Sequence, residues 1–158
     1  MGEGKYNAND VAKFFLYKVN DMTQKKLHKL LFFAYAWYLY ENNEEDNIVN
    51  RLFVPNNPSY GFQAWVHGPV FRELYPLYAD YGYRPINNFF FDESIFDEED
   101  LSLLNRIVEF FGPMSADELE RESHKFYSWK KAREGYEPYE ACKELLDDID
   151  IYHDIELI

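Results

Sequence analysis

Apolar residues recur along most of the chain at the three- to four-residue spacing of a helix, and polar segments separate these stretches. The first stretch predicts a helix from a cap at Asn9 or Asp10 to about Val19. The second predicts a helix over residues 23–41, which is apolar on every side across residues 30–40. A helix that is apolar all round must be surrounded by protein. We therefore expect this to be the central helix, with the other helices packed about it.

Residues 42–61 break the helical pattern. They are polar and then rich in Pro and Asn, which predicts a long loop with a candidate short strand at residues 52–54. Residues 62–67 alternate apolar and polar side chains, which predicts a second short strand. The Gly-Pro pair that follows favours the start of a helix. We expect that helix over residues 69–82, with a kink at Pro76.

Three more helices are predicted in the last third of the chain. One runs from its cap Asp97 to Phe111, and a capping box predicts another over residues 115–124. The third is predicted over residues 137–148. From about residue 149 we expect a short acidic C-terminal tail, either as a small strand or as a docked segment.

Together these elements predict a mainly α fold. We expect the central hydrophobic helix to be surrounded by about five shorter helices, with a minor short β element. Residues 86–96 are ambiguous between helix, strand and loop. No repeat, Gly/Ser linker or break in composition divides the chain, so we expect a single domain over residues 1–158.

Charge narrows the range of partners. The chain has 16 basic and 29 acidic residues, for a formal net charge of −13, so most of its surface repels phosphate backbones and attracts basic proteins. We expect no nucleic acid partner. Two basic groups with aromatic neighbours keep single-stranded nucleic acid open as an alternative to paired surface charges. They are Lys25, Lys26 and Lys29, and Lys130, Lys131 and Arg133.

Aromatic residues make up 20% of the chain, which suits both a core and a protein interface. The single cysteine excludes an intramolecular disulfide. The longest apolar run, residues 30–40, is half of the about 20 residues that a membrane span requires. The N-terminus lacks a signal pattern. We therefore expect a cytoplasmic protein with no membrane partner.

No pattern in the chain indicates catalysis. The sequence has no G-x-S-x-G, no P-loop and no H-E-x-x-H or C-x-x-C. Cys142 lies in a predicted helical stripe with Tyr139, Leu145 and Leu146, which predicts a buried and inert thiol. The four histidines are scattered: they are His28, His67, His124 and His153. We therefore expect no catalytic residue, no metal site and no cofactor.

The tripeptide His67-Gly68-Pro69 has two interpretations. In a functional interpretation it is a rigid, partly exposed turn that presents His67 and Trp65. In a structural one it is the corner between a strand and a helix, where Gly supplies the backbone angles and Pro starts the helix. The sequence favours the structural interpretation without excluding the other.

Several segments in a fixed order carry a family resemblance. They are D-V-A-K-F-F-L near residue 10, M-T-Q-K-K-L-H-K-L-L-F-F-A-Y-A at residues 22–36, F-Q-A-W-V-H-G-P-V at 62–70, S-A-D-E-L at 115–119, and His124 with Trp129. This order resembles the Panacea domain of SocA-like antitoxins, also described as phage-associated GepA-like proteins. The resemblance covers about residues 9–135, and the family more often has Tyr where this chain has His67.

The resemblance implies a mainly helical domain that neutralises a protein toxin by direct binding, with the toxin encoded by the adjacent gene. We expect this chain to be such an antitoxin of a type II-like toxin–antitoxin system, and not an enzyme. One family member delivers its toxin to a cytoplasmic protease, so a proteolytic adaptor is an alternative. Some relatives carry a DNA-binding segment, for which we expect no room here. A small hydrolase that uses His67 or His124, or a phage-encoded regulator, is the remaining alternative.

The resemblance and the Gly-Pro corner together suggest where the partner binds. We expect the partner surface near this corner and the long loop before it, although the same residues could instead build the core. The candidate residues are Lys29, Trp65, His67, Gly68, Pro69, Val70, Tyr75 and Trp129. The sequence leaves the oligomeric state open.

Overall fold

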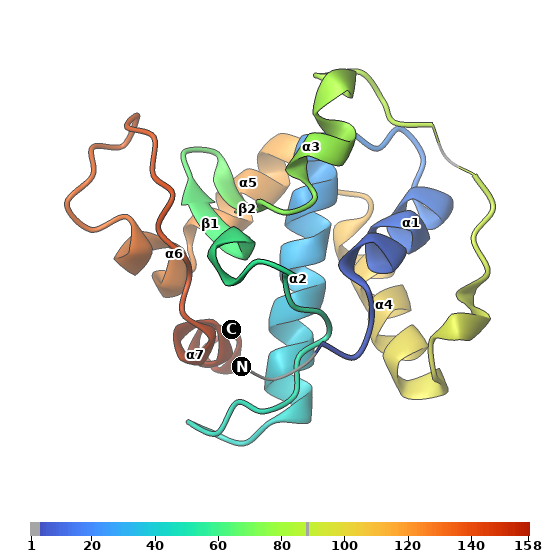
Figure 1. Ribbon diagram of the computed structural model, residues 1–158, viewed down its shortest axis with the longest axis horizontal. Helices are drawn as coiled ribbons and strands as arrows, with labels where there is room; N and C mark the ends of the chain where they lie inside the picture. The colour runs from blue at the N-terminus through green and yellow to red at the C-terminus, as the bar shows by residue number, and fades with distance from the viewer. Residues whose placement is uncertain (1–3, 88) are drawn as a thin grey trace.

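The computed structural model describes residues 4–87 and 89–158, which form seven α-helices and one two-stranded antiparallel hairpin (Figure 1). The helices are α1 (Ala8–Lys18), α2 (Gln24–Asn42), α3 (Tyr75–Tyr78), α4 (Glu98–Phe111), α5 (Ala116–His124), α6 (Tyr127–Ala132) and α7 (Asp148–Glu156). The strands are β1 (Phe62–Trp65) and β2 (Gly68–Phe71). The mainly α fold class with a minor β element is confirmed.

Helix α2 is the centre of the molecule, as its apolar sequence predicts. It packs against α1, α4, α5, α7 and β2, and Figure 1 shows it running through the middle of the fold. Its aromatic rings contact rings from several other elements. Phe33 stacks on Phe111 of α4 with 4.3 Å between ring centroids, and the centroids of Phe32 and Phe62 of β1 lie 5.3 Å apart. Burying each such ring stabilises the fold by about 1.5–3 kcal/mol.

The helix starts follow capping chemistry, with one correction. Helix α1 begins at Ala8 because the Asn7 side chain accepts from the backbone N–H of Asn9, so a cap at Asn9 or Asp10 is wrong. The predicted starts of α4 and α5 are confirmed. Asp97 caps α4, and Ser115 forms the capping box of α5.

The helix predicted over residues 69–82 is wrong in its first half. Residues 68–71 form β2, which pairs antiparallel with β1 through a two-residue turn, with Trp65 opposite Gly68 and Phe62 opposite Phe71. Because every residue of β2 is buried, the strand lacks the polar alternation that would have predicted it. The second half is helical, as α3 followed by a 3-10 turn at residues 79–81, and Pro76 lies in the first turn of α3 instead of kinking it.

The long loop after α2 contains two fully buried residues, Leu52 and Phe53. The candidate strand at residues 52–54 does not form. Instead, the carbonyls of Arg51 and Leu52 accept hydrogen bonds from the backbone N–H groups of Lys5 and Tyr6, at 2.9 Å each. The N-terminal segment therefore holds this loop against the core.

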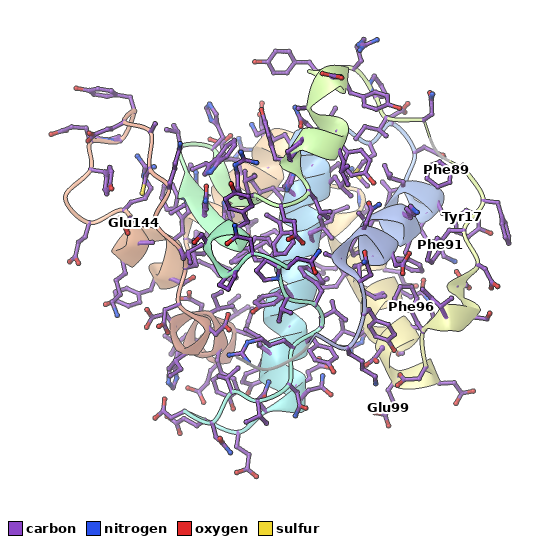
Figure 2. The ribbon with its side chains drawn as sticks, viewed as in Figure 1. Tyr17, Phe89, Phe91, Phe96, Glu99 and Glu144 are labelled. Atoms are coloured by element: carbon purple, nitrogen blue, oxygen red, sulfur yellow. The ribbon has the colours of Figure 1, made fainter. Side chains whose placement is uncertain are left out.

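The helix predicted over residues 137–148 is also wrong. The chain is irregular there, and it runs beside β1, where Ala64 N–H donates to the Glu144 carbonyl at 2.9 Å (Glu144 is labelled in Figure 2). The residues from about 149, expected as a strand or docked segment, form helix α7, capped by Asp147 and packed on α2. None of the helices in the described part of the chain is both long and apolar enough to cross a membrane.

Residues 89–96 carry aromatic side chains to the outer side of α1. Figure 2 shows Phe89, Phe91 and Phe96 on the side of the molecule where Tyr17 lies. Phe96 is buried, with Phe14 of α1 at 5.6 Å, whereas Phe89 is exposed. This segment, ambiguous in the sequence, is therefore largely irregular, with one short 3-10 turn at residues 93–95, and it packs through the buried ring of Phe96 and the partly buried ring of Phe91.

Candidate functional site

The turn between β1 and β2 lies on a buried lysine. Lys29 of α2 is 1% exposed, and its Nζ donates to the Pro69 carbonyl oxygen at 3.2 Å. Gly68 has a φ of +106°, and a Cβ there would lie 2.5 Å from Lys29 Cε and 2.6 Å from Ser123 Oγ. Position 68 therefore needs glycine both for its backbone angle and for the space that the lysine fills. We call this turn and the residues packed under it the hairpin corner.

Burial changes the protonation of two neighbouring side chains in α2. It lowers the pKa of Lys29 to about 7, an effect that the charge of Lys25 strengthens and that of Glu120 opposes. Burial, together with the charge of Lys29, lowers the pKa of His28 to about 3. Because His28 Nδ1 accepts the Phe71 backbone N–H at 3.2 Å, the neutral ring carries its proton on Nε2. The corner therefore rests on a neutral imidazole and an amine that titrates near neutrality.

An acidic side chain of α5 connects the corner to the surface. Glu120 binds Lys25 Nζ at 2.5 Å and lies 3.2 Å from His67 Nδ1. Although burial opposes it, these hydrogen bonds from Lys25 and His67 hold the pKa of Glu120 below its usual range. Asp117 binds the same Lys25 at 2.8 Å. Lys25, Asp117 and Glu120 are therefore joined by ion pairs beside the corner.

Two rings cover the other side of the corner. His124, at the end of α5, stacks on Trp129 of α6 with 4.0 Å between ring centroids. Trp129 Nε1 donates to the Trp65 carbonyl at 3.0 Å, and the Trp65 ring lies 4.8 Å from that of Tyr75. The spacing of His124 and Trp129 in the sequence thus serves to place one stacked pair against the hairpin.

The structure brings all eight candidate residues to the hairpin corner and divides them by exposure. Lys29, Gly68, Pro69 and Val70 are buried, and Trp65, Tyr75 and Trp129 are half-buried. His67 has a side chain that is 71% exposed. Four of the candidates therefore build the inside of the corner, and four form its rim.

Sequence reasoning missed Arg133 and Glu120. The sequence predicts that Arg133 belongs to a basic surface group, but Arg133 is buried. Its guanidinium donates to the carbonyls of Ala64, Glu137 and Glu140 at 2.8, 2.9 and 2.6 Å. Lys29, assigned to the other basic group, is also buried. Glu120 reads as one of many helix-surface acids, so no local signal distinguishes it. The two basic groups do not form continuous patches.

The structure also places Cys142 and shows a group of acidic residues around His153. Cys142 is buried as predicted, but in an irregular segment, and Tyr139 beside it in the sequence is exposed.

Among the described residues, Glu45, Asp46 and His153 form one group whose ligand atoms could reach a common metal ion. His153 Nε2 lies 3.2 Å from Asp46, and the hydrogen bonds that this imidazole donates to the carboxylates of Glu156 and Asp46 raise its pKa. Ion pairing accounts for this exposed group.

The fold and the corner define a class: a mainly helical domain that presents aromatic and imidazole rings on a hairpin held by buried polar contacts. Aromatic side chains of this kind are enriched in protein interfaces. The family model "Antitoxin SocA-like, Panacea domain" matches residues 27–130, which include the whole hairpin corner. The chain belongs to this antitoxin family. No curated protein and no solved structure matched the chain.

Proposed function

We propose that this chain is the antitoxin of a type II-like toxin–antitoxin system and that it neutralises a protein toxin by direct binding in the cytoplasm. The observation that carries the proposal is membership of the SocA-like antitoxin family over residues 27–130. The formal net charge of −13 supports it, because an acidic surface steers a basic protein partner toward itself. The toxin is expected from the adjacent gene.

We propose that the rim of the hairpin corner contacts the toxin. Trp65, His67, Tyr75 and Trp129 are at least partly exposed there, and aromatic side chains of this kind supply much of the binding energy in protein interfaces. The buried members, Lys29 and residues 68–70, then act indirectly, by holding the rim in place.

Co-expression with the adjacent reading frame tests the antitoxin function. We expect the neighbour alone to stop growth, and this chain to restore growth and to co-purify with the neighbour. An empty vector is the control. A neighbour that is harmless alone, or that stays toxic while this chain is present, would contradict the proposal.

The lifetime of the toxin separates two modes of neutralisation. Under occlusion, the toxin persists in the complex while growth recovers. Under delivery to a protease, the toxin disappears after synthesis is stopped, and deletion of the protease restores its level. A pulse–chase measurement with and without this chain tells the two apart. We propose occlusion as the principal mode.

One observation favours a hydrolase as a second candidate: His67 has a carboxylate, Glu120, at 3.2 Å, as a general base would need. The hydroxyl nearest the corner does not support it, because Ser123 is fully buried and donates to the Glu120 carbonyl. His67→Ala decides between the candidates. A binding protein leaves the mass of the purified toxin unchanged, whereas an enzyme that modifies the toxin alters this mass only when His67 is present.

A further inference from the structure

A cleft lies at the other end of the hairpin from the corner. Its volume is about 630 Å³, and its lining comes from the long loop after α2, from the hairpin and from residues 145–151 at the start of α7. Its floor is apolar and includes the buried rings of Phe62 and Phe71. In one wall, Leu145 and Ile149 are 45% and 40% exposed. The cleft therefore combines buried apolar rings in its floor with accessible apolar side chains in one wall, and its size is that of a ligand site.

The charged groups of the cleft leave an excess of negative charge. Asp148 accepts from the Tyr35 hydroxyl and from Arg51 Nε, at 2.7 Å each, so the one arginine of the cleft is already paired. Asp147 uses its carboxylate to accept backbone N–H groups at the start of α7. The surrounding segment, residues 137–158, has eight acidic residues and one lysine. A cationic group brought to this cleft would be attracted.

We propose that this cleft receives a segment of the toxin in which an apolar side chain lies next to a lysine or arginine. The inference rests on the antitoxin function proposed above and names the chemistry of the contact. Charge complementarity selects this occupant over a second copy of the chain, because each copy carries a formal net charge of −13. The apolar side chain fills the space above the floor, and the cation lies near Asp147.

The position of the cleft also indicates what it decides. Its floor and one wall lie within residues 27–130, the range that the family shares. The opposite wall, residues 145–151, lies outside that range. The cleft thus combines residues of the family's shared range with residues 145–151, which lie outside it, and a wall outside that range is suited to distinguish one toxin from another. We therefore assign to this cleft a role in selecting the toxin.

Two lysine substitutions test the apolar contact. Ile149→Lys and Leu145→Lys place a charge in the cleft wall at positions that are already exposed, and we expect each to weaken toxin binding by about tenfold or more. Leu157→Lys is the matched control, because Leu157 lies just after α7 and is 84% exposed. The control should bind like the wild type in calorimetry, and thermal unfolding verifies that all three variants fold.

Two Asp→Asn substitutions, one in the cleft and one outside it, test the cationic contact. Asp147→Asn keeps a good helix cap while it removes the charge, so we expect weaker binding with a smaller dependence on salt. Asp92→Asn is the control, because Asp92 also caps a short helix with its side chain but lies outside the cleft. Its affinity and salt dependence should match those of the wild type.

The outcomes separate this inference from the function on which it rests. If the wild type binds the toxin and the cleft variants bind equally well, the cleft assignment is overturned and the antitoxin function stands. If the wild type does not bind the neighbouring gene product, both fail. If light scattering shows a dimer that Ile149→Lys dissociates while toxin binding is unchanged, the cleft is instead a contact between copies of this chain.

Discussion

Lys29 and Gly68 meet at a distance that leaves no room for another heavy atom. The lysine stem passes under the turn, and only glycine permits both this approach and the positive φ. The charge of the buried lysine lowers the free energy of unfolding, because its hydrogen bond to the Pro69 carbonyl does not replace the water it has lost. At the scale of residues, the corner is therefore a sterically demanding and electrostatically costly arrangement.

Replacement of Gly68 by alanine should destabilise the protein strongly. The new Cβ clashes with Lys29 and Ser123 and is strained at a φ of +106°, so we expect a loss of about 2–4 kcal/mol in urea unfolding. Gly135→Ala is the matched control, with a φ of +87° and no atom within 4 Å of the added Cβ. It should lose only about 1 kcal/mol. Equal losses in the two variants would show that the contact with Lys29 is unimportant.

The buried amine predicts a specific pH dependence of stability. The pKa of Lys29 is about 7 in the folded protein and 10.5 in an unfolded chain, so between these values the unfolded state binds more protons. Stability therefore rises with pH from 7 to 10.5, by up to about 1.4 kcal/mol per pH unit for this one group, and the unfavourable contribution is complete below pH 7.

Lys29→Met isolates this contribution. We expect the variant to gain stability relative to the wild type near pH 7 and to lose this advantage as the pH approaches 10. Lys143→Met, at an exposed position, controls for the change in net charge. The comparison uses urea unfolding at a series of pH values. A constant difference between Lys29→Met and the wild type would mean that the amine does not change its protonation on folding.

At the scale of elements, one side chain organises the irregular segment before α7. Arg133 donates to carbonyls in β1 and in residues 137–140, while the Leu146 N–H donates to the Phe62 carbonyl at 3.0 Å. These contacts satisfy backbone groups that a helix would have satisfied internally. They explain why a stretch with the apolar spacing of a helix is not one.

Arg133→Met should loosen that segment. The variant keeps an unbranched stem but removes the guanidinium donor from the carbonyls of Ala64, Glu137 and Glu140, of which Glu137 still accepts the Glu140 N–H, so we expect a loss of about 2–4 kcal/mol. Hydrogen exchange should rise most in residues 137–146, which the guanidinium holds. Lys130→Met is the control, because Lys130 is exposed on α6, the helix that Arg133 follows directly. Unchanged exchange in residues 137–146 would contradict the role of Arg133.

At the scale of the molecule, charge governs how partners approach. The chain has a formal net charge of −13, and this charge accelerates its association with a basic toxin at low salt. We expect the association rate constant to fall by about tenfold or more between low and high salt, with little change in dissociation. Stopped-flow mixing measures this. The same field predicts that the protein flows through a nucleic-acid column at low salt, and salt-dependent retention would instead favour the regulator alternative.

The sequence predicted those elements whose signals are local. The all-round apolar character of α2 identified it as the central helix, and side-chain caps located the starts of α4 and α5. The candidate site was predictable as a set of residues, since Trp65, His67 and Trp129 lie in recognisable blocks. The sequence did not predict that these residues and Lys29 meet at one corner, because residues as distant in sequence as Lys29 and Trp129 come together only through packing.

The sequence by itself determined the helical class, the central helix and the family, because apolar periodicity, caps and motif order are properties of short segments. The tertiary structure alone decided that residues 68–71 pair as a strand, that Lys29 and Arg133 are buried, and that residues 145–151 form one wall of a cleft. The physical reason is the same in each case. A backbone or charged group satisfies its hydrogen bonds with whatever partner the fold brings near, and that partner is distant in sequence.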